Sequence, residues 1–120
     1  MPFSKWSRTI FIVWCISICA VSYFSLIPQL ELPVDFWNAD KAYHCAAYAW
    51  LSALAMLSFP IRRLALSSAL FMIILGILLE IGQHFIPGRS FSLLDMAANS
   101  LGVFLGIFST LYSTRRLLEK

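Results

Sequence analysis

The chain has 120 residues, enough for one domain, and a formal net charge of +3. Hydrophobic residues make up 60% of it and charged residues 12%, whereas a soluble domain is about 45–50% apolar and about 25% charged, so the composition excludes an ordinary soluble fold. The basic residues lie in separate groups rather than in one stripe with interleaved aromatics, which excludes a typical nucleic-acid-binding protein.

The first apolar stretch predicts a membrane-spanning helix over residues 9–27. Residues 10–27 carry no charge, and a helix of that length measures roughly 27 Å, close to the thickness of the hydrocarbon core. Lys5 and Arg8 precede it, as basic residues also precede the core of a signal peptide. Because this apolar stretch is longer than a typical signal core, we favour a retained helix, with cleavage as the minor alternative.

Three further apolar stretches predict helices over residues 40–59, 64–86 and 91–112. Proline follows the second and third stretches closely, which is typical of helix ends. A helix in lipid satisfies its own backbone hydrogen bonds, whereas an open sheet edge cannot. We therefore predict an all-α fold in which residues 1–120 form one four-helix transmembrane bundle, with sequence neighbours antiparallel.

The distribution of basic residues predicts the orientation. With the N-terminus in the cytoplasm, the outer segments hold only Lys41 and Arg89. The inner segments then hold seven basic residues: Lys5, Arg8, Arg62, Arg63, Arg115, Arg116 and Lys120. This bias follows the positive-inside rule and predicts that both termini are cytoplasmic, N-in/C-in.

Polar and charged residues gather at the predicted outer end of the last three helices, and the inner end holds no comparable group. They are Asp40, Lys41, His44, Glu80, Gln83, His84, Arg89, Asp95 and Asn99. Helical spacing places Asp40, His44 and Tyr48 on one stripe of the second helix. The convergence of so many polar side chains near one membrane face predicts a shared site.

Glycines share the polar faces of the third and fourth helices. Gly76 lies on the stripe of Glu80 and Gln83, and Gly102 and Gly106 lie on that of Asp95 and Asn99. These two faces are expected to turn inward, towards each other and away from lipid. The small-xxx-small pair at 102 and 106 favours ordinary helix packing over a dimer motif.

The cost of burying these groups bears on their role. An acidic side chain at the centre of a membrane helix costs about 2.5–3.5 kcal/mol on insertion scales, less near the interface, so Glu80 and Asp95 need partners. Arg89 can offer a bidentate guanidinium to either. Polar groups can also simply join helices, at about 0.6 kcal/mol per hydrogen bond. The number of converging residues favours a functional pocket over packing alone, although both hypotheses stay open.

Metal and cofactor chemistry have little support in the sequence. His44, Glu80, His84 and Asp95 lack the spacing of a motif such as HExxH, so we expect neither a metal nor a cofactor. The three cysteines, Cys15, Cys19 and Cys45, lie in apolar stretches without CxxC spacing and are expected to be free.

Two segments resemble the VanZ-like family, which is named for a teicoplanin-resistance protein of bacteria. They are DKAYHCAAYAWL at 40–51 and GILLEIGQHFIPGRSFSLLDMAANSLGVFLG at 76–106. The positions that match the family pattern are Asp40, Lys41, His44, Glu80, Gln83, Arg89, Asp95, Asn99, Gly102 and Gly106. His84 lies outside the pattern. The resemblance, over residues 40–106, implies a multi-pass protein of the bacterial inner membrane that acts in the cell envelope.

Two functions are compatible with this pattern. An outward-facing pocket could bind an envelope lipid or a lipid-linked wall precursor, with Lys41 and Arg89 meeting a phosphate or carboxylate and with Gln83, Asp95 and Asn99 orienting it. The alternative is an intramembrane enzyme acting on such a substrate, with Glu80 or His44 as general acid or base. A transporter is disfavoured because the polar residues stop short of the inner face. The oligomeric state does not follow from the sequence.

Overall fold

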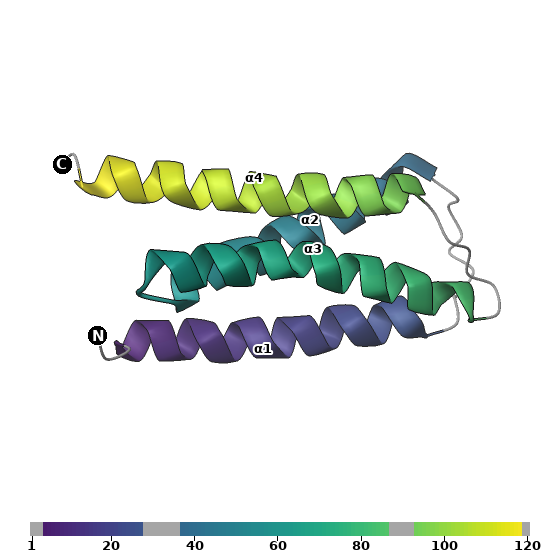
Figure 1. Ribbon diagram of the computed structural model, residues 1–120, viewed down its shortest axis with the longest axis horizontal. Helices are drawn as coiled ribbons and strands as arrows, with labels where there is room; N and C mark the ends of the chain where they lie inside the picture. The colour runs from purple at the N-terminus through teal and green to yellow at the C-terminus, as the bar shows by residue number, and fades with distance from the viewer. Residues whose placement is uncertain (1–3, 28–36, 87–92, 119–120) are drawn as a thin grey trace.

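The computed structural model describes residues 4–27, 37–86 and 93–118, and within these ranges it is helical and contains no strand. The predicted all-α four-helix fold is therefore confirmed (Figure 1). The four helices are α1 (Lys5–Leu26), α2 (Trp37–Ser58), α3 (Arg62–His84) and α4 (Leu93–Leu118).

The helix ends differ from the predicted ones by several residues. α1 begins at Lys5 because Ser4 caps it: the Ser7 backbone N–H donates to the Ser4 hydroxyl oxygen over 3.1 Å. α4 continues to Leu118, six residues beyond the predicted end at 112. The apolar pattern marks where the chain meets lipid, whereas a helix continues into the interface wherever caps and propensity allow it.

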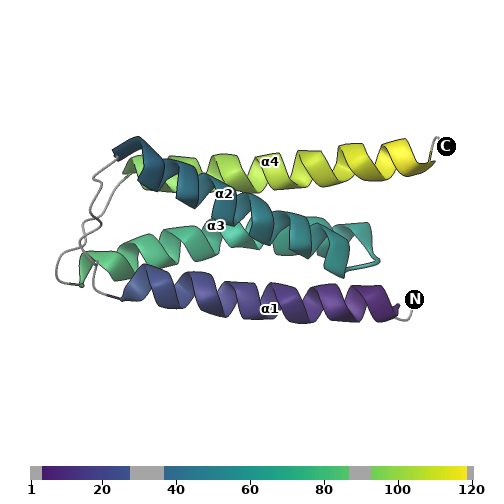
Figure 2. The ribbon, with the colours of Figure 1, turned by 180° about the vertical axis from the view of Figure 1, so that it is seen from behind.

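The helices form an elongated bundle whose Cα atoms extend 48 × 24 × 23 Å. α2 lies at its centre and packs against α1, α3 and α4, while α3 also contacts α1 and α4. Figures 1 and 2 show α1 and α4 on opposite sides, with α2 and α3 between them. Both termini lie at one end, which we call the terminal end, and the opposite end we call the polar end.

Among the described residues, three helices are long and apolar enough to cross a membrane: α1, α3 and the Leu93–Arg115 part of α4, with mean hydropathies of 2.1, 2.4 and 1.4. The sequence predicted four such helices. α2 falls short although it has 22 residues, because it carries polar side chains such as Lys41, His44 and Ser52. Its central position explains how it stays in the bundle: neighbouring helices, rather than lipid, surround much of it.

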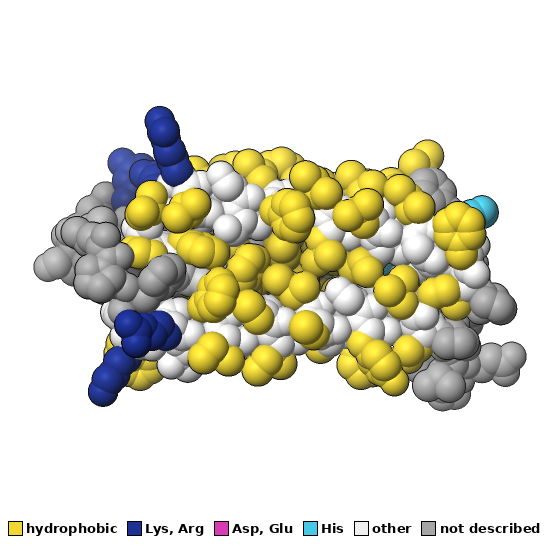
Figure 3. Space-filling model, turned by 60° about the horizontal axis from the view of Figure 1, so that its bottom comes forward, with side chains coloured by type: hydrophobic (Ala, Val, Ile, Leu, Met, Phe, Trp, Pro, Cys, Tyr) yellow, Lys and Arg dark blue, Asp and Glu magenta, His cyan; other side chains and the backbone are white. Residues whose placement is uncertain are grey.

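The outer surface matches a lipid environment. Large apolar side chains are exposed along α1, α3 and α4, among them Ile16, Leu78 and Phe108 at 63%, 58% and 64%. Figure 3 shows hydrophobic side chains over the length of one face, with lysines and arginines at the terminal end. An exposed apolar area of this extent would not be stable in water.

The glycines of α4 face α2, not α3, so the expectation that the polar faces of the third and fourth helices pack on each other is wrong for this part of α4. A Cβ atom at Gly102 would collide with the carbonyl oxygen of Cys45, and one at Gly106 with the Ser52 hydroxyl and the carbonyl of Ala49. The backbones of α2 and α4 are thus in direct contact. Gly76 of α3 faces the Tyr48 ring, 3.1 Å from the position of its missing Cβ.

Candidate functional site

An ion pair joins the beginnings of α2 and α4 at the polar end. The Lys41 ammonium lies 3.1 Å from Asp95 Oδ1, and their side chains are 22% and 11% exposed. Asp95 sits in the first turn of α4, where the helix dipole favours a negative charge. Asp95 is therefore paired with a lysine from α2, a contact that the sequence did not predict.

A second polar contact lies one turn deeper along the same two helices. His44 Nδ1 and Asn99 Oδ1 are 3.0 Å apart, and Asn99 is 3% exposed. Because a carbonyl oxygen can only accept, this contact requires the proton of His44 on Nδ1. The hydrogen bond fixes the orientation of the ring.

Glu80 is the most deeply buried acidic side chain among the described residues, with 1% exposure. It lies one turn after Gly76, where the absence of a side chain admits the Tyr48 ring and the Asn99 amide. Glu80 is thus held between α2, α3 and α4 rather than facing lipid.

Gln83 connects the end of α3 to α1. Its amide donates a hydrogen bond to the carbonyl oxygen of Ser25 over 3.0 Å, and the side chain is 4% exposed. Sequence reasoning missed this contribution of α1 because the acceptor is a backbone carbonyl, which has no sequence signature.

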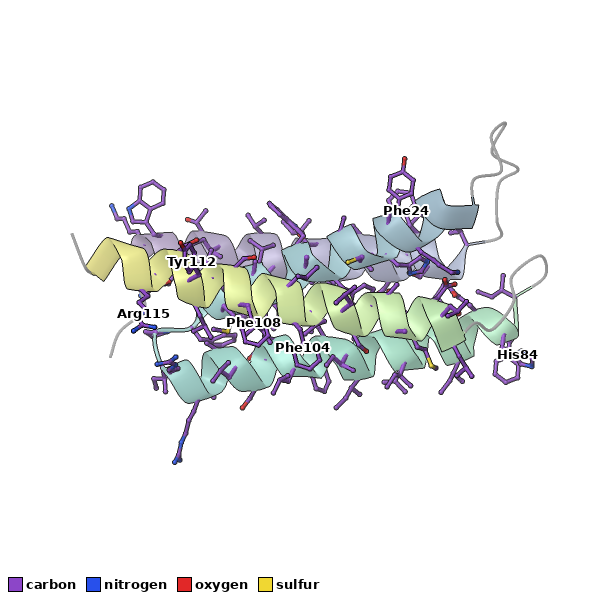
Figure 4. All side chains as sticks on the ribbon, turned by 90° about the horizontal axis from the view of Figure 1, so that it is seen from above. Phe24, His84, Phe104, Phe108, Tyr112 and Arg115 are labelled. Carbon is purple, nitrogen blue, oxygen red and sulfur yellow. The ribbon has the colours of Figure 1, made fainter. Side chains whose placement is uncertain are left out.

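A cavity of about 320 Å³ lies beside these contacts, between α1, α2 and α3. Its polar lining includes His44, Tyr48 and Gln83, and its apolar lining includes Val21 and Phe24 of α1. Figure 4 shows Phe24 towards the polar end, away from Tyr112 and Arg115. We call this space, with the Lys41–Asp95 and His44–Asn99 contacts next to it, the polar-end site.

Other predicted site residues lie elsewhere or outside the described structure. Arg89 falls outside the described residues, as does the side chain of Asp40, so the predicted Arg89 salt bridge stays a prediction. His84 is exposed at the end of α3, with its ring 5.5 Å from that of Phe85. Its position agrees with its place outside the family pattern.

The described residues contain no group of three His, Cys, Asp or Glu side chains that could hold a metal ion. Cys15, Cys19 and Cys45 are free thiols.

A family model described as VanZ/LLP1 matches residues 2–114, nearly the whole chain. The chain belongs to the VanZ/LLP1 family. The family match begins well before residue 40 and so includes α1, in which the sequence alone showed no motif. No match was found among curated proteins or among solved structures.

The polar-end site of this VanZ/LLP1 protein combines two kinds of surface. Donors and acceptors from α2 and α3 meet the apolar side chains of α1 within one cavity. Such a cavity suits an amphipathic molecule, because polar groups fix its orientation while apolar walls remove its hydrocarbon part from water.

Proposed function

We propose that the chain is a multi-pass protein of the bacterial inner (cytoplasmic) membrane that binds an envelope lipid or a lipid-linked wall precursor in the polar-end site. The carrying observation is the cavity lined by His44, Tyr48 and Gln83 on one side and by Val21 and Phe24 on the other. Its volume of about 320 Å³ accommodates a headgroup or part of an acyl chain rather than a whole lipid.

The polar-end site faces outward in this proposal. Lys41, and Arg89 from the sequence between α3 and α4, would meet a phosphate or carboxylate of the ligand. A role in the envelope would also connect the protein to glycopeptide (teicoplanin) resistance, which is the phenotype we expect to change in a deletion strain.

An intramembrane enzyme is the alternative. The fixed His44 ring next to the cavity favours it, because a general base must be oriented by a second group. We prefer binding, because the sequence carries no nucleophile motif and no phosphate-binding loop. An enzyme would turn over a lipid substrate in purified form and lose that turnover in His44→Gln.

The orientation has a direct test. With both termini cytoplasmic, Glu31→Cys and Arg89→Cys, in a background without native cysteines, should react with a membrane-impermeant thiol reagent on intact cells. Arg62→Cys should react only after the membrane is opened, because the turn before α3 then faces the cytoplasm. Labelling of Arg62→Cys on intact cells would reverse the orientation.

The ligand cavity is tested by filling it. Val21→Phe places a ring in the cavity, and lipid analysis of the purified protein should show at least a tenfold loss of the specifically retained molecule, because little room for it remains. Val13→Phe is the matched control, since Val13 lies on the same helix at 38% exposure and does not line the cavity. Equal retention by wild type, Val21→Phe and Val13→Phe would refute the binding proposal.

Glu80→Gln in the same assay separates a ligand site from packing alone. The amide keeps the shape and removes the charge, and a neutral amide costs less to bury than a carboxylate. We expect the folded protein to persist while ligand retention falls, since functional sites trade stability for activity. Glu31→Gln, the same chemical change between α1 and α2, is the control. If Glu80→Gln retains as much ligand as the wild type at normal abundance, the role of Glu80 is purely structural.

A further inference from the structure

A second, larger cavity lies at the terminal end of the bundle. It has a volume of about 920 Å³ and is formed by the last turn of α2, the first turn of α3 and the last turns of α4. Figure 4 shows Phe108, Tyr112 and Arg115 of α4, which belong to its lining, towards this end. It is separate from the polar-end site, with which it shares no lining residue.

The mouth of this cavity is positively charged. Arg62 lines it from α3 and Arg115 from α4. The first turn of α3 contains no acidic residue, and Ile61, at its N-cap, makes no side-chain capping hydrogen bond. Both lining arginines carry a positive charge, which favours an anionic ligand.

The threonines of the lining do not supply donors to that anion. The Thr110 hydroxyl donates to the Gly106 carbonyl over 2.8 Å, and the Thr114 hydroxyl donates to the Thr110 carbonyl over 2.8 Å. Each hydroxyl has one proton. The guanidinium groups, which present planar pairs of donors suited to phosphate, are therefore the groups that would recognise it.

Apolar side chains line the rest of the cavity, among them Met56, Phe59 and Leu111. On α4, Phe108 stacks on Phe104 with ring centroids 6.5 Å apart, and both rings are exposed. An apolar track thus runs along α4 from the charged mouth towards the middle of the bundle. This combination fits a ligand that has an anionic group at the mouth of the cavity and a hydrocarbon chain attached to it.

We propose that the terminal-end cavity binds one anionic glycerophospholipid of the surrounding bilayer, with its phosphate at Arg62 and Arg115 and an acyl chain along Phe108 and Phe104. The volume falls within the roughly 300–1,000 Å³ typical of ligand sites. A second copy of the chain would bring its own arginines to the same end, so like charges disfavour that occupant. A lipid with a negatively charged headgroup has the complementary charge.

The test uses the full chain in vesicles of equal parts phosphatidylglycerol and phosphatidylcholine, followed by extraction and mass measurement of retained lipid. The wild type should retain phosphatidylglycerol preferentially, and Arg62→Gln and Arg115→Gln should each lower its retention about fivefold. Arg63→Gln is the matched control, because Arg63 is exposed next to Arg62 but does not line the cavity. It should change retention by less than about twofold.

Three outcomes would overturn the proposal. They are equal retention of the two lipids by the wild type, normal phosphatidylglycerol retention in both cavity variants, and an equal loss in Arg63→Gln, which would indicate diffuse attraction to the charged end. The cavity-filling Val21→Phe should leave phosphatidylglycerol retention unchanged, so failure of the polar-end proposal would not affect this one. If one of the two cavity variants does not fold, phosphatidylglycerol retention by the other variant tests the proposal.

Discussion

Gly106→Ala and Gly102→Ala are each expected to lower the free energy of unfolding by about 3 kcal/mol, the largest effects that we predict for single methyl groups in this protein. At both positions the added Cβ would collide with a backbone carbonyl of α2, that of Ala49 or of Cys45. A backbone carbonyl inside a helix cannot rotate away as a side chain can. The two helices must therefore separate, and the contacts along their whole interface weaken.

Gly82→Ala is the control for this prediction. Its Cβ would lie 3.1 Å from a terminal methyl of Leu26, which can rotate, and alanine also favours the helix by about 1 kcal/mol over glycine. Unfolding by sodium dodecyl sulfate in mixed micelles, followed by circular dichroism, measures all three variants. If Gly106→Ala unfolds at the same detergent fraction as Gly82→Ala, the backbones of α2 and α4 are not in contact.

The second large effect concerns the ion pair at the polar end. Asp95→Ala should cost about 3 kcal/mol and Lys41→Ala about 2 kcal/mol, because each removes one member of a partly buried ion pair. The aspartate variant should be the worse of the two, since it also removes a favourable charge from the first turn of α4. The double variant should be about 1–2 kcal/mol more stable than the sum of the single changes implies.

A double-mutant cycle in the same micelles measures that coupling. The control cycle combines Asp95→Ala with Lys5→Ala, because Lys5 lies at the beginning of α1, at the terminal end. Those two changes should be additive within about 0.5 kcal/mol. Additivity of the Lys41 and Asp95 changes would show that the pair contributes nothing to stability.

The sequence predicted the helices and the gathering of polar residues because both follow from periodicity along one chain. Residues three or four positions apart must share a helix face, and antiparallel helices must return to the same end. These two rules suffice to place Lys41 and Asp95 at one end of the bundle. The two rules do not predict that these two residues contact each other. Several basic and acidic residues share that end, and spacing alone does not show which of them form pairs.

The contacts between helices could not be predicted in the same way. An inward face on α4 fits equally well against α2 or α3, and the choice of α2 depends on how Cys45, Ala49 and Ser52 accommodate Gly102 and Gly106. The apolar wall of the polar-end cavity comes from α1, whose side chains resemble any lipid-facing set. In the sequence, the arginines of the terminal end indicate only the orientation of the chain in the membrane. Their spacing does not show that two of them also line a cavity.

The central position of α2 bears on the number of times that the chain would cross the bilayer. Three apolar helices alone would be an odd number of crossings, which places the two termini in different compartments. In the bundle α2 runs beside the other three, and both termini lie at the same end (Figure 2). An even number of crossings thus depends on α2, the described helix that is not apolar enough to cross a membrane by itself. In the proposed multi-pass arrangement, the insertion machinery would have to accept α2 together with its neighbours, because protein side chains, rather than hydrocarbon, would solvate its polar groups.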